Sequence, residues 1–268
     1  MKNNQELFIK KIKREKLLVS ITQASIILVF ILLWEFLVKF EIINGFIYSS
    51  PSRILNTLIE LFNNNVLFLH IYTTLKEVLI SFFLGIILGF IISLILYECK
   101  FLSKVLDPFL TMLNSLPKIA LGPLIIIIAG ANTKSIIIMA LLINLIISII
   151  TIYNGFCSTD EYKIKLLKSF KASKKQILTF LVIPSSYSTI ITSLKLNISL
   201  TLIGVIMGEF LVSKSGIGYI IVYGKQVFNL DYVMTGIILL MIISYILYKL
   251  IIVLEKKLLK NNENHTAV

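Results

Sequence analysis

Charged residues are scarce in this 268-residue chain. They make up 15% of it, whereas 57% is hydrophobic and the mean hydropathy is +0.93. A soluble domain of this size needs a larger polar fraction to cover its surface. Several windows instead approach the ~20 apolar residues that cross a bilayer. The shortage of charge therefore excludes an ordinary soluble domain and predicts an all-α, polytopic membrane helical bundle.

Residue types used in catalysis are equally few. Cys99 and Cys157 are far apart and lack the paired spacing of a zinc or redox motif. With only His70 and His265, no H-E-x-x-H occurs, and G-x-S-x-G is also missing. "GANTKS" at 130–135 ends like a phosphate loop but lacks its second Gly. We therefore expect no catalytic residue, no metal site and no cofactor bound by this chain, which is not an enzyme. If it moves solute uphill, a partner subunit must use the ATP.

Acidic residues are also in short supply, at 14 against 26 Lys and Arg, which gives a net charge of +12. Such a charge could indicate nucleic-acid binding. Membrane proteins, however, retain Lys and Arg in their cytoplasmic loops, and this explanation is favoured. We expect no nucleic-acid partner. Residues 1–19 form a basic tail, and the apolar run after it has no small-x-small cleavage site, so it is predicted to be an uncleaved first span.

The apolar windows predict about six transmembrane helices. Pro117, Lys118 and Pro123 interrupt the third, so we expect it to be broken or bent. The predicted spans are 20–38, 78–96, 108–130, 135–153, 190–212 and 233–254.

The distribution of basic residues predicts the orientation. If the N-terminus is cytoplasmic, the inner segments carry eighteen Lys and Arg residues and the outer segments five. This bias predicts a multi-pass protein with both termini in the cytoplasm, including a tail at 256–268. The outer segment 39–74 contains "SSPSRILNTLIELF", where Ile54, Leu58 and Leu61 or Phe62 share the spacing of a short interfacial helix. Residues 75–255 form the predicted core domain.

Two spans carry small residues at every fourth position. Such ridges let two helix backbones approach closely. Plain helix packing is the favoured explanation, and ridges that slide or rock during transport are the alternative. The ridge residues are Ser81, Gly85, Gly89 and Ser93, and then Gly204 and Gly208.

Four polar residues lie within predicted spans: Asn144, Ser148, Asn197 and Glu209. Intramembrane polar groups are candidates for a translocation path. Hydrogen bonding between helices is the ordinary alternative, and for Glu209 a structural partner such as Lys214 is an equal one.

The longest inner loop, 154–189, carries six Lys against Asp160 and Glu161. Ile164, Leu167 and Phe170 mark an apolar stripe on one short helix, and a second helix follows a break near Lys171 to Ser173. Apolar anchors in a polar rim are typical of a docking surface for a soluble partner. The alternative is a basic loop lying on anionic membrane lipid.

The chain resembles the permease subunit of a bacterial ABC importer of the binding-protein-dependent family, in the sulfonate, taurine and nitrate branch. That family's signature is E-A-A, three residues, Gly, nine residues, then I-x-L-P. With Pro184 as the final Pro, Lys171 stands at the Gly, and Lys165, Leu166 and Leu167 stand at E-A-A. Further resemblances are "SLPKIALGPLIIIIAG" at 115–130, "SFKAS" at 169–173 and "GEFLVSKSGIGYII" at 208–221.

The resemblance implies a type I importer fold in the bacterial cell membrane. A second permease subunit, as a homodimer, would surround the path, and an extracytoplasmic binding protein would deliver the solute. A cytoplasmic ABC ATPase would receive the coupling loop in a groove. The residues assigned to this coupling are Ile164, Leu167, Lys168, Phe170, Lys171, Ala172, Ser173 and Pro184. An ion-coupled secondary transporter is the main alternative, and a membrane scaffold or enzyme is a third.

Overall fold

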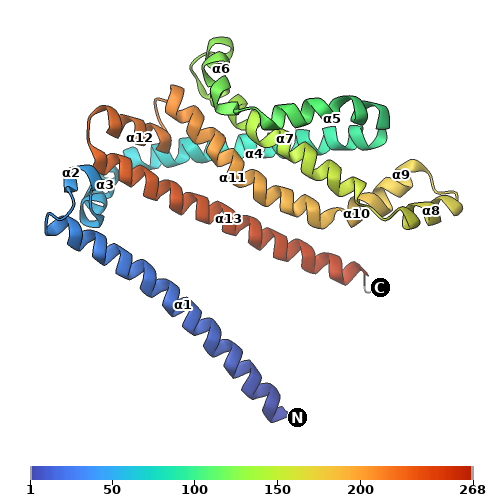
Figure 1. Cartoon of the computed structure of the whole chain (residues 1–268), viewed down its shortest axis with the longest axis horizontal. Helices are drawn as coiled ribbons and strands as arrows, with labels where there is room; N and C mark the ends of the chain where they lie inside the picture. The colour runs from blue at the N-terminus through green and yellow to red at the C-terminus, as the bar shows by residue number, and fades with distance from the viewer. Residues whose placement is uncertain (1, 267–268) are drawn as a thin grey trace.

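The computed structural model describes residues 2–266, with side chains for 11–256, and 88% of the chain is helical. No strand occurs among the described residues. Figure 1 shows most of the long helices running side by side, with short helices at both ends and one short helix standing out from the side of the bundle. The long helices are α1 (Lys2–Lys39), α4 (Val66–Glu98), α5 (Lys100–Ser115), α7 (Thr133–Cys157), α11 (Tyr187–Val212) and α13 (Leu230–Thr266).

Within the described range, five helices are long and apolar enough to cross a membrane, and a bent pair brings the number to six. This agrees with the predicted bundle of about six transmembrane helices. The bent pair joins α5 to the 3-10 turn Lys118–Leu121 and to α6 (Gly122–Ala129), at an angle of 88°. The break falls at Leu116 and Pro117, where proline has no N–H for helical bonding. The expected bend of the third span is thus observed.

Several helix boundaries differ from the predicted ones. The helix α4 begins at Val66, inside the predicted outer segment 39–74, and therefore includes Glu77. The third span begins at Lys100 rather than 108, with Pro108 inside α5. The predicted tails at 1–19 and 256–268 continue as α1 and α13, and residues 1, 267 and 268 of them lie outside the described residues. The apolar windows thus predicted the existence of these helices better than their ends.

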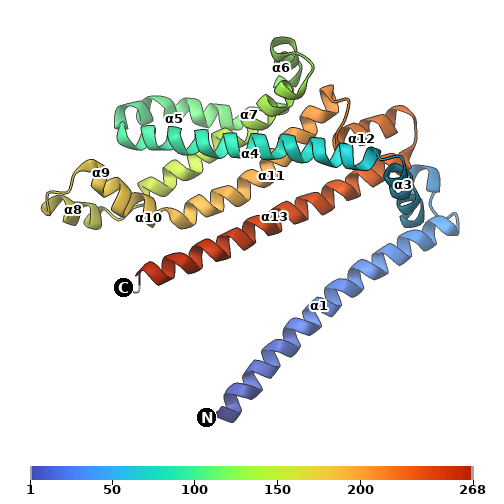
Figure 2. The same ribbon diagram turned by 180° about the vertical axis from the view of Figure 1, so that it is seen from behind.

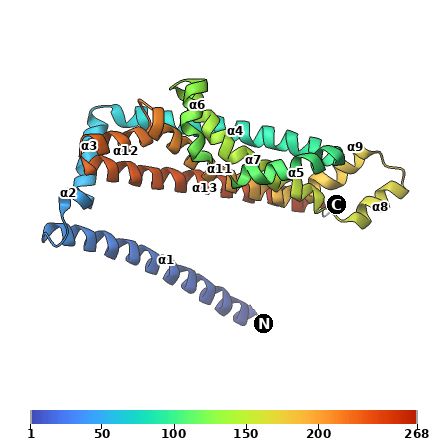
Figure 3. The same cartoon turned by 45° about the horizontal axis from the view of Figure 1, so that its top comes forward.

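The core of the bundle is the contact of α7 with α4 on one side and α11 on the other. Buried aliphatic residues from these helices and from α13 form one cluster, which includes Val78, Ala140 and Val205. The two remaining long helices contribute little to it. The apolar window of α1 has none of its residues buried, α5 has no buried residue, and α1 diverges from the bundle in all three views (Figures 1, 2 and 3).

Two short helices, α2 (Gly45–Tyr48) and α3 (Pro51–Asn63), connect α1 to α4. Ser50 caps α3 and Pro51 begins it, an arrangement that suits a proline because its missing N–H is not needed there. Ile54 and Leu61 are buried, whereas Phe62 is exposed. The predicted short helix is therefore present, with one apolar face turned toward α4 and α13.

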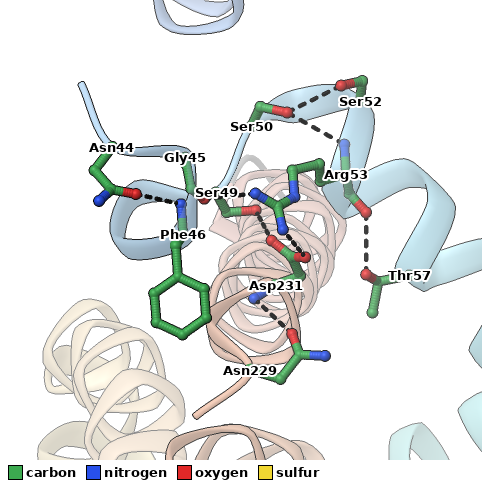
Figure 4. A network of polar contacts seen from close by, with 10 residues as sticks. All are labelled: Asn44, Gly45, Phe46, Ser49, Ser50, Ser52, Arg53, Thr57, Asn229 and Asp231. Atoms are coloured by element: carbon green, nitrogen blue, oxygen red, sulfur yellow. Dashed lines mark hydrogen bonds and ion pairs between the residues drawn. The ribbon is translucent and has the colours of Figure 1, made fainter. Parts of the chain in front are cut away.

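Polar contacts fasten this connection to the start of α13 (Figure 4). Asp231 accepts a hydrogen bond of 2.6 Å from the Ser49 hydroxyl and lies 3.2 Å from the Arg53 guanidinium. Arg53 also donates to the Gly45 carbonyl at 2.8 Å. On the other side, Glu35 of α1 accepts from the amide and hydroxyl of Ser52. We refer to this end as the α3–α12 end, because α12 (Ile217–Gln226) also lies there (Figure 2).

Candidate functional site

The opposite end of the bundle carries two short helices that project past the long ones (Figures 1 and 2). They are α8 (Glu161–Ser169) and α9 (Lys174–Ile177), the latter followed by a π-helical turn at Leu178–Val182 and by α10 (Ile183–Ser185). The side chain of Asp160 caps α8 by accepting from the Tyr162 amide at 2.8 Å. We refer to residues 161–177 as the α8–α9 segment.

The turn between the two helices has the geometry of a helix C-cap in which one residue is left-handed. Lys171 has φ of +59°. Its amide donates to the Lys168 carbonyl at 2.9 Å, and the Ala172 amide donates to the Leu167 carbonyl at 3.0 Å. These two bonds define the Schellman motif, in which glycine usually takes the left-handed position. The turn therefore forms with a lysine where the family signature has its glycine.

Ser173 begins α9 through a capping box. Its hydroxyl accepts from the Gln176 amide at 3.3 Å, and the Gln176 side chain accepts from the Ser173 amide at 2.8 Å. Each partner satisfies a backbone donor that a helix start leaves free. The sequence Ser-Lys-Lys-Gln thus explains why the chain resumes a helix directly after the break, which falls in the predicted region.

The apolar residues of the α8–α9 segment point in two directions. Ile164, Leu167 and Ala172 are partly buried against a cluster formed by Ile152, Phe156, Ile177 and Val182. Tyr162, Leu166 and Phe170 are 80%, 56% and 74% exposed. The predicted stripe of Ile164, Leu167 and Phe170 is therefore divided. Its first two members hold the segment to the bundle, and the exposed apolar surface consists of Tyr162, Leu166 and Phe170.

Two hollows lie against the α8–α9 segment, and one of them borders the exposed Phe170 ring. One, of about 270 Å³, is lined by Leu167, Ala172, Gln176 and the rings of Phe170 and Phe180. The other, of about 430 Å³, separates the segment from the ends of α4 and α7, and Lys100, Lys168 and Lys174 are among its lining residues. The α8–α9 segment therefore combines exposed rings, hollows and lysines.

Pro184 lies where the chain returns to the bundle. It belongs to α10, directly after the π-helical turn, and has no amide hydrogen to continue the bonding pattern. Next to it, the Ser186 hydroxyl donates to the Gly155 carbonyl at 2.8 Å, and Ser185 contacts Thr159 at 3.0 Å. The chain that follows the α8–α9 segment is thus bonded back to α7.

The small residues of both predicted ridges lie at the close contacts of α7. A Cβ atom added to Gly85 or Gly89 would overlap Asn144 or Ser148, and one added to Gly204 or Gly208 would overlap Ala140 or Ile136. Ser93 donates to the Ile149 carbonyl at 3.0 Å, and the Ser81 carbonyl accepts from Asn144 at 3.1 Å. The ridge residues of α4 and α11 thus face α7 from its two sides.

Three of the predicted path residues are completely buried between the same helices. Asn144 donates to the Thr201 hydroxyl at 2.6 Å, and the Ser148 hydroxyl donates to Asn197 at 2.8 Å. Asn197 in turn donates to the Ser193 carbonyl at 2.7 Å. Within one chain these side chains bond α7 to α11 rather than face an opening. A role in the translocation path remains a prediction.

Glu209 is buried as well, and it does not pair with Lys214, which is exposed. Its carboxylate accepts from the Thr74 hydroxyl and from the Gly218 amide, both at 2.6 Å. The Ile217 amide donates to Thr74 at 2.8 Å, and the Gly216 amide to His70 Nδ1 at 2.9 Å. Side chains from α4 and α11 thus bond the first amides of α12, including the N-cap Gly216, whose φ of +116° suits glycine.

Sequence reasoning missed several partners. Glu77, one turn after Thr74 on α4, is a buried carboxyl group that the sequence analysis did not anticipate: it is 1% exposed, and its Oε2 atom has no hydrogen-bond partner among the described residues. Lys195 and Glu255 form an ion pair of 2.7 Å between α11 and α13. The signal that the sequence offered for these buried groups was the presence of charged residues at the edges of the predicted spans. No cluster of three or more His, Cys, Asp or Glu suited to a metal occurs among the described residues.

Comparison with known proteins assigns this architecture to a family. The family described as "Binding-protein-dependent transport system inner membrane component" matches residues 81–260. The putative aliphatic sulfonates transport permease protein SsuC of Bacillus subtilis is 26% identical over 232 residues, covering 87% of this chain and 84% of its own. The taurine transport system permease protein TauC of Escherichia coli is 21% identical over 224 residues, covering 82% of each chain.

The fold is similar to that of a solved transporter. An inward-facing structure of the MetNI methionine ABC transporter matches with a TM-score of 0.63 and 16% identity, covering 72% of this chain and 95% of that one. The family match extends over more than half of the chain, and the relatives named for sulfonates and taurine cover most of it. The chain therefore belongs to the binding-protein-dependent transport system inner membrane components and is an ABC importer permease of the sulfonate and taurine branch.

Proposed function

We propose that this permease forms the path for a small solute such as a sulfonate, taurine or nitrate, and that a separate ATPase drives it through the α8–α9 segment. The observation that carries the proposal is the exposed surface of Tyr162, Leu166 and Phe170 on a projecting segment. Protein interfaces concentrate their binding energy in such aromatic and apolar anchors, surrounded by polar groups. ATP then acts by favouring the conformation in which these contacts are best.

The proposed sidedness puts the α8–α9 segment and both chain ends in the cytoplasm. Both ends lie toward the α8–α9 end of the molecule (Figure 1), and the basic residues are concentrated in the segments assigned to that side. The α3–α12 end would then face an extracytoplasmic binding protein, which presents the solute.

A second copy of the permease is the proposed partner within the membrane. The helix α5 has no buried residue, and the apolar window of α1 has none. Membrane lipid and a second subunit together would cover these faces. The solute path is proposed to run between the two subunits, and the ATP is hydrolysed by the partner ATPase, since the sequence offers no phosphate loop.

A double substitution of Leu166→Asp and Phe170→Asp tests the coupling. Charging two exposed anchors should reduce co-purification of the cognate ATPase by roughly tenfold or more, since anchor residues contribute about 2 kcal/mol or more each. Insertion of the chain should be normal, because neither side chain is buried. The measurement is the ratio of ATPase to permease after affinity purification from membranes.

The matched control is Leu55→Asp with Phe62→Asp, which changes the same residue types at exposed positions of α3, at the opposite end. It should leave the ratio unchanged. Equal ATPase retention in both variants would overturn the coupling role. If retention is equal but the first variant alone loses binding to anionic vesicles, the segment is a lipid anchor. Uptake driven by an ion gradient without any ATPase would instead support the secondary transporter.

A further inference from the structure

A positively charged side chain lies at the break of the third span, between the two ends of the bundle. Lys118 follows Pro117 and begins the 3-10 turn that leads into α6. One turn later, Gly122 approaches α7 and α11 so closely that an added Cβ atom would lie 3.1 Å from Met139 and 2.6 Å from Leu211. The break is therefore packed against the side of the bundle, where Figure 3 shows α6 standing out. An ionisable residue within a membrane-spanning segment is costly and marks a candidate functional site.

The Lys118 ammonium has a single hydrogen-bond acceptor among residues 11–256. It donates at 2.9 Å to the Asn114 carbonyl in the last turn of α5, where carbonyls lack helical partners. Because Asn114 lies one turn back, toward the α8–α9 end, the ammonium points along α5 and not toward the α3–α12 end. No carboxylate in the same range pairs with it. A lysine ammonium carries three N–H donors, so two remain for a ligand.

The side of α5 that leads to Lys118 carries a row of polar groups. They recur at every fourth position and therefore lie along one ridge of the helix. The ridge consists of Ser103, Asp107, Thr111 and Ser115. Its first three members line a cavity of about 230 Å³ together with Tyr153 and Asn154 of α7, and the hydroxyls of Ser103 and Tyr153 lie 2.5 Å apart. Polar groups of this kind are expensive against lipid, so the ridge is suited to water or to a polar solute.

The charges along this side of α5 indicate which sign the solute carries at the break. Asp107 lies eleven residues before Lys118, roughly 16 Å along the axis at the rise of an α-helix. It is therefore too distant to act as the counter-ion of Lys118. The partner of the ammonium must then come from outside the chain. Anionic oxygens accept charge-assisted hydrogen bonds from an ammonium group, and sulfonate and nitrate groups supply such oxygens.

We propose that Lys118 is the residue of the solute path that binds the anionic group of the transported solute. This inference rests on the proposed function, since it requires a path along the uncovered side of α5 and a solute that carries an oxyanion. The Asn114 carbonyl holds the ammonium at the break, and the two remaining N–H donors bind the anion as it passes. A purely structural lysine would instead only cap the end of α5, where a cation is favourable.

Uptake by the complete transporter in proteoliposomes, with the cognate ATPase and binding protein, tests the proposal. The probes are taurine, methanesulfonate and nitrate. Lys118→Met should lower the maximal rate about tenfold or more, because a charge-assisted contact is lost, and leave the apparent KM nearly unchanged, because the binding protein that captures the solute is intact. Lys118→Arg keeps the charge and should retain most of the rate. Lys134→Met removes an exposed lysine at the start of α7 and should transport normally.

Chemical restoration of the charge provides a second readout. Lys118→Cys is made together with Cys99→Ser and Cys157→Ser, because both native cysteines are exposed. Water-soluble methanethiosulfonate reagents should reach the new thiol if it faces the path. The aminoethyl reagent adds an ammonium group and should restore uptake. The sulfonatoethyl reagent adds a negative charge and should not.

Unchanged uptake in Lys118→Met, an equal loss in Lys134→Met, or equal effects of the two reagents would overturn the proposal. So would a thiol that no water-soluble reagent modifies, because the side chain would then face lipid. Each of these outcomes is measured against normal wild-type uptake and leaves the proposed function standing. A wild-type transporter that takes up none of the three anions would overturn the proposed solute class, and this inference with it.

Discussion

The two ends of the bundle are held together by contacts of different range. At the α3–α12 end, side chains bridge residues far apart in the sequence, as Asp231 does with Ser49 and Glu209 with Thr74. In the α8–α9 segment, the polar bonds are local: Asp160 caps α8 and Ser173 caps α9. One end is therefore determined by the tertiary fold, whereas the other is a locally encoded motif packed on the bundle by a small apolar cluster.

This difference suits the two tasks proposed for the ends. A segment that bonds mostly within itself keeps its shape while its position changes, as a coupling element requires. Long-range bonds instead fix elements relative to one another. The structure between the two ends must be rigid if movement at one is to reach the other, and α7, packed tightly on both sides, provides that connection.

Removing the close packing of α7 should have the largest effect, because both ends depend on it. In Gly85→Leu the new side chain overlaps Asn144, and we expect destabilisation of about 3 kcal/mol or more. The measurement is the fraction of extracted chain that elutes as a single species in size-exclusion chromatography. Ile87→Leu, at an exposed position on the same helix, is the control. Normal elution of Gly85→Leu would show that this ridge does not determine assembly.

A smaller effect should separate the two ends. Asp231→Ala leaves Ser49 and Arg53 without their partner, and we expect a loss of about 1–2 kcal/mol and faster proteolysis around α3. Asp160→Ala removes a helix cap at the other end. It should increase exchange of the α8 amides and change the global Tm little. Equal effects of the two variants on Tm would remove the distinction between the ends.

The smallest effect should be a gain at the α8–α9 turn. Lys171 adopts a left-handed conformation that costs a non-glycine residue about 1–2 kcal/mol. Lys171→Gly should stabilise the turn by roughly 0.5–1 kcal/mol, since glycine's extra freedom in the unfolded chain offsets part of the gain. Hydrogen exchange of the Ala172 amide should slow about two- to fivefold. Lys171→Ala keeps the Cβ atom and should not slow exchange of the Ala172 amide. Slower exchange in that variant would show that removal of the lysine charge, and not of the Cβ atom, stabilises the turn.

The parts of the fold predicted correctly were those with local signals. Hydropathy located the long apolar helices, Pro117 marked the bend, and apolar spacing within the 154–189 loop indicated two short helices with a break near Lys171 to Ser173. The division of Ile164, Leu167 and Phe170 was not predicted, because α8 ends at Ser169 and helical spacing no longer fixes the direction of Phe170. Periodicity also does not say which face of a short helix meets the bundle.

Burial of charge was the harder problem. Lys76 and Glu77 looked like the polar edge of a span, so the second span was predicted to begin at Val78. Whether Glu77 is buried depends on how α4 packs against distant parts of the chain, as the bond between Thr74, one turn before it, and Glu209 illustrates. Lys214 was the nearest cation in sequence to Glu209, but the fold brings Thr74 and Gly218 to that carboxylate instead. Such pairings follow from tertiary contacts that no local pattern contains.

The divergence of α1 has a consequence for biosynthesis. This helix precedes the other helices of the bundle and is therefore made before them, and α2 and α3, its main contacts, are short and follow it. It must therefore persist in the bilayer while its neighbours are still in the ribosome. Its lipid-compatible surface on every side, with large apolar residues such as Phe30 and Leu32 exposed, meets that requirement. Membrane integration of the first segment is thus separable in time from assembly of the remaining bundle.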